Sequence, residues 1–194
     1  VVFVSTLALN QFKKRFGDLV NGEVIYNFID KPQIQTKSEE KVSFPENDEN
    51  VPVICSVGRL AEVKGYKRLL RAHKRLINEG ALHKIWLLGI GEEEENLKSY
   101  CQENGLNETV RFLGFQSKPY PYVRQSDIYV CSSFAEGYPL SVAEALSLNK
   151  PIVATNCTGP TEILHNGDFG LLVDNSEDGI FNGLRDVLTD SELL

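Results

Sequence analysis

The chain has 194 residues, of which 42% are hydrophobic, and its formal net charge at pH 7 is −7. This length can bury one full hydrophobic core with part of a second. The acidic balance argues against nonspecific nucleic-acid binding, which requires a basic surface. No apolar run approaches the roughly 20 residues that span a bilayer.

The start of the chain and its cysteines bear on its origin. The sequence begins Val1-Val2-Phe3-Val4-Ser5 and contains no Met, so we expect a piece of a longer gene product. This start lacks the basic leader of a signal peptide. The four cysteines, at positions 55, 101, 131 and 157, have no Cys-x-x-Cys spacing, which argues against a zinc site or a disulfide framework. We therefore expect a reducing, cytoplasmic environment.

The first fifty residues differ in pattern from the rest. They predict a strand at residues 1–5, a helix at residues 6–16 and a second strand at residues 23–26. Residues 31–50 are polar, contain two prolines and predict a linker.

Beyond residue 50, apolar strands alternate with amphipathic helices. The expected strands are residues 51–57, 84–88, 110–113, 128–131, 152–155 and 171–173, and the expected helices are residues 64–79, 92–103, 120–125, 140–148 and 177–188, with a helical turn near Glu162. This alternation predicts an α/β fold with a doubly wound, Rossmann-like parallel sheet. Ligands of such sheets bind beyond the carboxyl ends of the strands.

The segment from Glu136 to Glu144 follows a buried strand and opens a helix. Pro139 suits a first helical position because it lacks the N–H that would be unpaired there. The amides of Leu140 and Ser141 would then be free at a positive helix end, which is a ready anion site. The two carboxylates flank this site and can accept hydrogen bonds from hydroxyls. A phosphate with hydroxyls on either side describes a nucleotide sugar.

This stretch resembles the E-x7-E motif of the retaining glycosyltransferases of family 4, which have the two-domain GT-B fold. The following segment, residues 151–173 with Gly159 and Glu162, is similar to the family's usual continuation, and so are residues 57–65 upstream. The similarity covers roughly residues 51 to 190 in order.

The resemblance implies a domain organisation. Residues 51–194 would be the C-terminal, nucleotide-sugar-binding domain of a GT-B enzyme, truncated at its C-terminus. Residues 1–30, which end in a turn at Asn27–Asp30, would close the N-terminal acceptor domain, and residues 31–50 would be the linker between the two.

Arg59 and Lys64 come just after the first strand of this domain. A departing nucleoside diphosphate gains negative charge, which preorganised cations stabilise. An isolated pair would more simply be two solvated cations, but the resemblance favours a catalytic role in binding the diphosphate. It also implies that Glu136 contacts donor-sugar hydroxyls near the reacting carbon and that Glu144 contacts the ribose. The simpler alternatives are a helix-start carboxylate for Glu136 and an exposed helix residue for Glu144.

Further donor contacts are expected from main-chain groups. They involve Gly58, Gly89 and Gly91 at strand ends, Arg111 in a segment whose main chain meets the base in the family, and Gly137, Tyr138, Leu140 and Ser141 around the helix start. Residues 89–91 are not a dinucleotide fingerprint, because Glu94 stands where a third glycine is required. For Arg111, an ordinary core strand is the alternative.

We expect no metal and no cofactor, because the chain has no Asp-x-Asp and the four consecutive glutamates at residues 92–95 fit a solvated first helical turn. The helix at residues 64–79 carries five cations away from its apolar face, namely Lys67, Arg68, Arg71, Lys74 and Arg75. Such a stripe is usually solvated, and peripheral contact with anionic lipid at the inner membrane face is the alternative. His73, His83 and His165 have no metal-ligand spacing and are expected to be structural or exposed.

The function implied is transfer of a sugar from a nucleotide-diphosphate sugar to a glycan, a lipid-linked glycan or a polysaccharide precursor, with retention of configuration. The acceptor would be held by the other domain, so this chain alone should bind donor weakly and transfer nothing. A nucleotide-sugar epimerase or a phosphorylase on the same fold is one alternative. A non-catalytic nucleotide-sugar-binding module is another, and the intact Arg59, Lys64, Glu136 and Glu144 argue against it.

Overall fold

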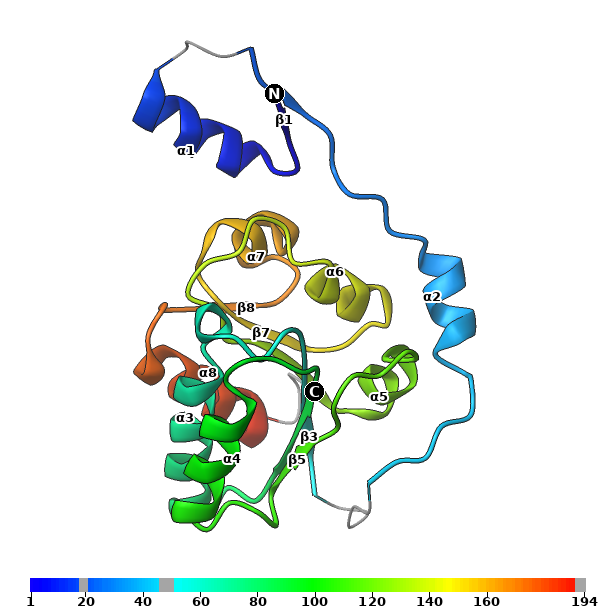
Figure 1. Cartoon of the computed structure of the whole chain (residues 1–194), viewed down its shortest axis with the longest axis vertical. Coiled ribbons are helices and arrows are strands. Elements are labelled where there is room, and N and C mark those ends of the chain that lie inside the picture. The colour runs from blue at the N-terminus through cyan, green and yellow to red at the C-terminus, as the bar shows by residue number, and fades with distance from the viewer. Residues whose placement is uncertain (18–20, 46–50, 191–194) are drawn as a thin grey trace.

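The computed structural model describes residues 1–17, 21–45 and 51–190. Its centre is a six-stranded sheet in the order β5-β4-β3-β6-β7-β8, in which all neighbouring strands are parallel. The strands are β3 (Val53–Val57), β4 (Lys84–Leu88), β5 (Val110–Phe112), β6 (Ile128–Cys131), β7 (Ile152–Thr155) and β8 (Leu171–Val173). The strand order reverses between β3 and β6, which opens a crevice at their carboxyl ends. The predicted doubly wound α/β fold is confirmed (Figure 1).

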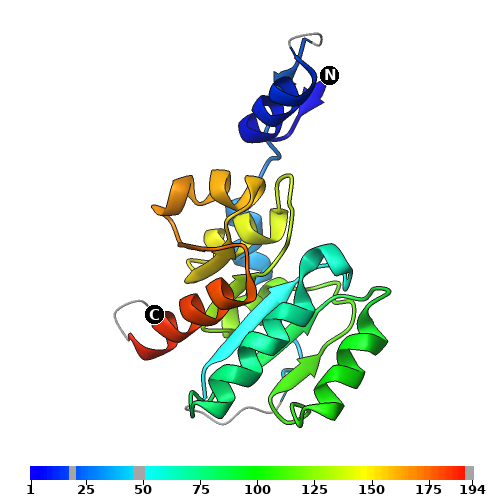
Figure 2. The same ribbon diagram turned by 90° about the vertical axis from the view of Figure 1, so that its left-hand side faces the viewer.

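Helices cover both faces of the sheet, because alternate residues of each strand point to opposite sides. Ile54 faces one hydrophobic core, whereas Val53 and Cys55 face the other. The first core packs under α3 (Tyr66–Asn78), α4 (Glu94–Glu103) and α8 (Glu177–Thr189), which lie in front of the sheet in Figure 2. The second packs under α5 (Tyr120–Gln125) and α6 (Leu140–Ser147). Shorter elements are α7 (Thr158–Ile163) and the 3-10 turns η1 (Glu62–Lys64) and η2 (His165–Gly167).

The polar face of α3 differs from the expectation at one residue. Arg68, expected among the outward cations, is buried with 6% of its surface exposed. That expectation was wrong because the guanidinium turns inward and donates to a backbone carbonyl. Arg71 and Arg75 lie near the carboxylates of Glu177 and Asp178 at the start of α8. The basic stripe is therefore partly neutralised within the fold.

A small unit formed by the first residues lies beside α7. It contains β1 (Val2–Phe3), α1 (Thr6–Phe16) and β2 (Glu23–Val24), and its two strands pair in parallel. The expected strand–helix–strand order is confirmed for these residues, although both strands are shorter than expected.

Glu162 of α7 joins this unit to the main sheet domain. Its carboxylate accepts hydrogen bonds from Ser5 Oγ, from the amides of Thr6 and Leu7, and from the Tyr26 hydroxyl. Although burial opposes it, these hydrogen bonds lower the pKa of Glu162 to about 2. Because α1 has no acidic residue in its first turn, Glu162 supplies the negative charge that its N-terminus favours.

The segment expected as a linker contains a helix, α2 (Lys31–Lys37). Asp30 caps it by accepting a hydrogen bond from the Gln33 amide at 3.0 Å. Ile34 is buried, and the helix lies against α5 and α6 (Figure 1). The segment is thus docked on the sheet domain over this part of its length.

A buried pair of histidines links α3 to the segment before β4. His83 Nδ1 lies 2.7 Å from the Ala81 carbonyl and donates to it, so its Nε2 accepts from His73 Nδ1 at 2.8 Å. Burial lowers the pKa of both rings, that of His73 to about 3. The structural role expected for these two residues is confirmed.

Candidate active site

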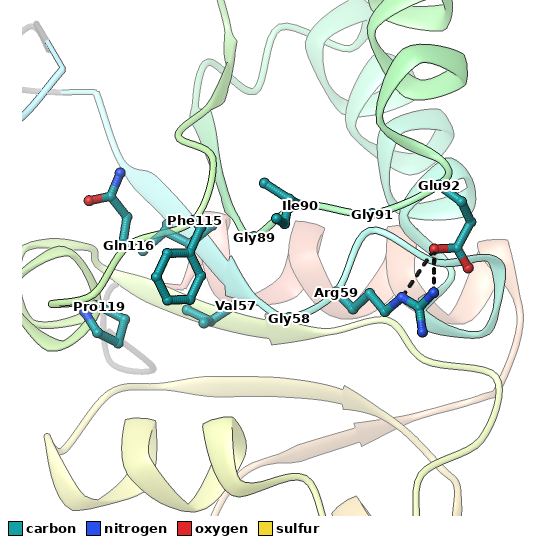
Figure 3. Close-up of a pocket in the computed structure, with 11 residues that line it drawn as sticks. Val57, Gly58, Arg59, Gly89, Ile90, Gly91, Glu92, Phe115, Gln116 and Pro119 are labelled. Atoms are coloured by element: carbon teal, nitrogen blue, oxygen red, sulfur yellow. Dashed lines mark hydrogen bonds and ion pairs between the residues drawn. The ribbon is translucent and has the colours of Figure 1, made fainter.

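A cavity of about 710 Å³ opens at the carboxyl ends of β3 and β4 (Figure 3). The residues that line it are Val57, Gly58, Arg59, Leu88, Gly89, Ile90, Gly91, Glu92, Phe115, Gln116 and Pro119. Ile90 and Phe115 are exposed apolar side chains at its mouth. A side chain at Gly89 would place its Cβ 1.9 Å from the Gly58 carbonyl oxygen. The glycine there allows the two strand ends to approach closely.

Arg59 lies at one end of this cavity and pairs with Glu92. Its Nη2 is 3.0 Å from Glu92 Oε2, and its side chain is 72% exposed (Figure 3). Such an exposed ion pair contributes little to stability. The Arg59 guanidinium is therefore free to exchange this carboxylate for a ligand anion at small cost.

Lys64 meets Glu136 between the end of η1 and the loop before α6. Lys64 Nζ lies 2.5 Å from Glu136 Oε1, and Ser133 Oγ donates to the same oxygen at 2.7 Å. The Glu136 side chain is only 12% exposed. Among the described residues, Oε2 of Glu136 has no hydrogen-bond partner. This oxygen is left to accept a hydrogen bond from a ligand.

The start of α6 presents two unpaired amides. Pro139, which was expected at the first helical position, is the N-cap just before it and has extended backbone (φ −72°, ψ 101°). Its carbonyl accepts the first helical hydrogen bonds, from the amides of Val142 and Ala143. Leu140 and Ser141 are therefore the first two helical residues. Within the part of the chain that the structure describes, their amides donate to no carbonyl. Free amides at a helix N-terminus are what the predicted anion site requires, and the site itself stays a prediction.

Glu144 lies one turn into α6 and is half-buried. The hydroxyl of Tyr120, at the start of α5, donates to its Oε1 at 3.0 Å. Burial raises the pKa of Glu144, and burial together with the nearby carboxylate raises that of Tyr120 to about 12. The alternative of an exposed helix residue is wrong for Glu144. Pro119, which precedes Tyr120, lines the cavity, whereas Tyr120 and Glu144 are not among the residues that line it.

Other residues expected to bind the donor have partners elsewhere in the structure. The Arg111 guanidinium contacts the Asn107 carbonyl and Glu108, both before β5, and Arg111 does not line the cavity. The Tyr138 ring lies 6.0 Å, centroid to centroid, from that of Tyr26. Arg59 and Lys64, expected to act together, pair with different carboxylates, those of Glu92 and Glu136.

Sequence reasoning missed three residues at this site, namely Ser133, Tyr120 and Arg68. Ser133 and Tyr120 each donate a hydroxyl to one of the two motif glutamates. Nothing in the spacing of the motif indicates these donors, since Tyr120 is 24 residues from Glu144. The burial of Arg68 is invisible to helical periodicity.

No group of three or more His, Cys, Asp or Glu side chains among the described residues is arranged to hold a metal ion. None of the helices they form combines the length and the apolar character needed to cross a bilayer.

The parallel sheet, the cavity at the carboxyl ends of β3 and β4 and the helices on both faces define a Rossmann-like α/β domain. The chain belongs to the family described as glycosyl transferases group 1, whose model matches residues 37–194. Its fold is that of the Rossmann-like domains of GT-B glycosyltransferases.

Curated relatives and solved structures agree with this assignment. The chain is 32% identical over 171 residues to the lipopolysaccharide core biosynthesis glycosyltransferase LpsE of Rhizobium meliloti. The matched region covers 88% of this chain and 48% of that relative. It is similar in fold to Anabaena HepE in complex with UDP, with a TM-score of 0.81, 21% identity and coverage of 100% of this chain and 55% of that one. S. aureus TarM gives a TM-score of 0.82 at 18% identity, covering 100% of this chain and 37% of that one. The chain spans about half the length of the curated relative.

Proposed function

We propose that this chain is the donor-binding half of a retaining glycosyltransferase, which transfers a sugar from a nucleotide-diphosphate sugar to a glycan or lipid-linked acceptor. The observation that carries the proposal is the arrangement at α6. Two unpaired amides follow Glu136 by a few residues, and Glu136 is held by Lys64 with one carboxylate oxygen free. An anion and a hydroxyl-bearing group bound side by side satisfy these groups.

Each part of the donor has its own place in the site, from the base through the ribose and the diphosphate to the sugar. The base lies in the 710 Å³ cavity against Ile90 and Phe115, and the ribose hydroxyls donate to Glu144 of α6. The diphosphate accepts hydrogen bonds from the two free α6 amides and from Lys64, with Arg59 released from Glu92. The sugar then donates a hydroxyl to Oε2 of Glu136.

The chemistry needs no nucleophile from this chain. The acceptor hydroxyl attacks the anomeric carbon on the face from which the diphosphate departs, and its proton passes to the leaving phosphate oxygen. The bond between the anomeric carbon and that oxygen breaks, and configuration is retained. Lys64 and the α6 amides oppose the charge that grows on the diphosphate, which is the interaction that accelerates the step.

Relatives and neighbours support both substrates. A solved structure of HepE contains UDP-glucose. The 22% sequence identity between HepE and this chain by itself shows only that the two share a fold. A Campylobacter jejuni relative, 32% identical over 173 residues, is named as a transferase acting on a diphospho-undecaprenol substrate. These names support a nucleotide-sugar donor and a glycan or lipid-linked acceptor for this chain.

The alternatives from the sequence are less favoured. A nucleotide-sugar epimerase needs proton-transfer groups at the sugar, and Glu136 is already engaged by two donors on Oε1. A non-catalytic binding module has no need of a lysine such as Lys64 in contact with Glu136, the carboxylate proposed to bind the sugar. Metal independence stays part of the proposal because the chain lacks Asp-x-Asp. The cytoplasmic location also stays a prediction, and lipid contact through α3 is disfavoured because Arg71 and Arg75 have carboxylate partners.

Thermal unfolding of this chain with a panel of nucleotide sugars tests the proposal. We expect UDP-glucose or GDP-mannose to raise the unfolding temperature equally with and without a chelator. A ligand at about 100 times its Kd stabilises by about 2.7 kcal/mol. The best donor is then tested for transfer by the protein that carries an acceptor domain, with the anomeric configuration of the product read by NMR. No shift with any nucleotide sugar, or a shift abolished by the chelator, would contradict the proposal.

A further inference from the structure

Arg68 is a buried cation without a carboxylate partner among the described residues. Its Nε and Nη2 donate to the Ser132 carbonyl at 2.9 and 2.6 Å. Its guanidinium carbon lies 3.8 Å from the centroid of the Phe134 ring. Nη1 is buried and has no hydrogen-bond partner, and burial lowers the pKa of the group.

A guanidinium in this place costs free energy that an apolar side chain would not. Removing a cation from water is only partly offset by two hydrogen bonds to one carbonyl and by an aromatic face. The neighbouring buried side chains of α3 are mostly apolar, for example Leu69 and Leu70. Packing alone therefore does not account for an arginine at position 68.

The carbonyl that Arg68 holds belongs to the segment that carries Glu136. This segment, residues 132–136, follows β6 and crosses the η1 turn, which carries Lys64. Ser132 Oγ donates to the Lys64 carbonyl at 2.9 Å, and the Phe134 amide donates to the Val63 carbonyl at 2.8 Å. Arg68 thus holds the segment that leads to Glu136, and that segment is in turn hydrogen-bonded to the turn that carries Lys64.

The close approach of these loops has little tolerance. A Cβ at Gly65, which has φ +65°, would lie 2.2 Å from the Ser132 carbonyl oxygen and 2.7 Å from Arg68 Nε. The Ser132 carbonyl therefore sits in a tight position between Gly65 and the Arg68 guanidinium. A shift of this carbonyl displaces the backbone that leads to Glu136.

The geometry points to Arg68 as a positioning residue for sugar recognition. By clamping Ser132 and stacking on Phe134, it sets where Glu136 presents its free Oε2 to the donor sugar. Arg68 itself contacts no part of the donor. This inference rests on the proposed function, because it assigns Glu136 to the sugar and not to the nucleotide.

The test compares the affinities of UDP and UDP-glucose for this chain, measured by titration calorimetry. Arg68→Met keeps much of the side-chain volume but removes the charge and both hydrogen bonds, whereas Arg68→Lys keeps the charge and loses the planar fork. Arg71→Met, an exposed position on the same helix, is the matched control. Phe134→Leu removes the aromatic face at an exposed position and serves if the Arg68 variants do not fold.

We expect Arg68→Met to leave the Kd of UDP within about threefold and to weaken the binding of UDP-glucose by about tenfold or more, which is the scale for losing one hydrogen bond between the sugar and the charged Glu136 carboxylate. Arg68→Lys should show an intermediate loss and Phe134→Leu a smaller one, while Arg71→Met should bind both ligands normally.

A folded Arg68 variant that binds both ligands normally, or loses affinity for both equally, would overturn the inference. If those variants do not fold, an unchanged ratio of the two Kd values in Phe134→Leu would overturn it. Failure of the wild-type chain to bind UDP or UDP-glucose is a different result, which would reject the proposed function itself.

Discussion

A single backbone amide of α6 can be removed with little other change to the fold. Leu140 is the first residue of the helix, where proline is well tolerated and its missing N–H breaks no helical hydrogen bond. Pro139 before it already has the extended backbone that a following proline requires. Leu140→Pro therefore deletes one proposed phosphate donor. Its matched control, Leu140→Ala, truncates the same exposed side chain and keeps the amide.

The expected magnitude follows from the loss of one hydrogen bond to a charged acceptor. Such a bond contributes about 1.5–3 kcal/mol, which corresponds to a roughly 10- to 150-fold weaker Kd. We expect Leu140→Pro to weaken the binding of UDP and of UDP-glucose by similar factors, because both ligands contain the diphosphate. Titration calorimetry measures this change, and the unfolding temperature of each variant confirms that α6 is intact. If a folded Leu140→Pro bound UDP as tightly as Leu140→Ala does, the diphosphate would not lie on α6.

Four further predictions follow from individual contacts. Glu144→Ala should weaken the binding of UDP itself, whereas Glu136→Ala should leave the affinity for UDP unchanged and weaken only the binding of UDP-glucose. Equal losses of UDP affinity in the two variants would refute this division of roles. Lys64→Ala in the transferase with its acceptor domain should lower kcat by roughly 10²–10³-fold, and a near-normal kcat would place the leaving group elsewhere. His73, whose pKa burial lowers to about 3, binds a proton in the unfolded state below about pH 6.5 but not in the folded state. The His73 ring therefore lowers the free energy of unfolding by about 2 kcal/mol at pH 5 relative to pH 7. Urea unfolding at the two pH values measures this loss, which should be smaller in His73→Leu, where only the contribution of His83 remains. Glu162→Gln removes the negative charge that caps α1, so hydrogen exchange at the α1 amides should accelerate while that of the central strands stays unchanged.

The sheet domain could be predicted from sequence because its signals are local. Each strand is a short apolar run, and each helix has a clear apolar period, so the order of elements from residue 51 onward agrees with the structure. The start of α6 was predicted to within one residue because Pro139 restricts its own backbone and removes a donor. The helix α2 was missed because only Ile34 is buried in a polar, proline-containing segment.

The contacts within the site could not be predicted in the same way. Lys64 and Glu136 are 72 residues apart, and only the crossing of η1 over the segment after β6 brings them together. Arg68 follows the helical period of a surface residue, yet its long side chain turns inward to reach Ser132. Pairings of this kind depend on tertiary geometry, which a periodic pattern does not encode.

A crystal structure of this chain with UDP-glucose bound is the most direct test of the central claim. We expect the uracil ring in the cavity beside Phe115 and the diphosphate oxygens within hydrogen-bond distance of the Leu140 and Ser141 amides. A glucose hydroxyl should contact Oε2 of Glu136, with no metal ion bridging the phosphates. A nucleotide sugar bound away from α6, or a diphosphate held by a metal ion in place of these amides and Lys64, would contradict the account.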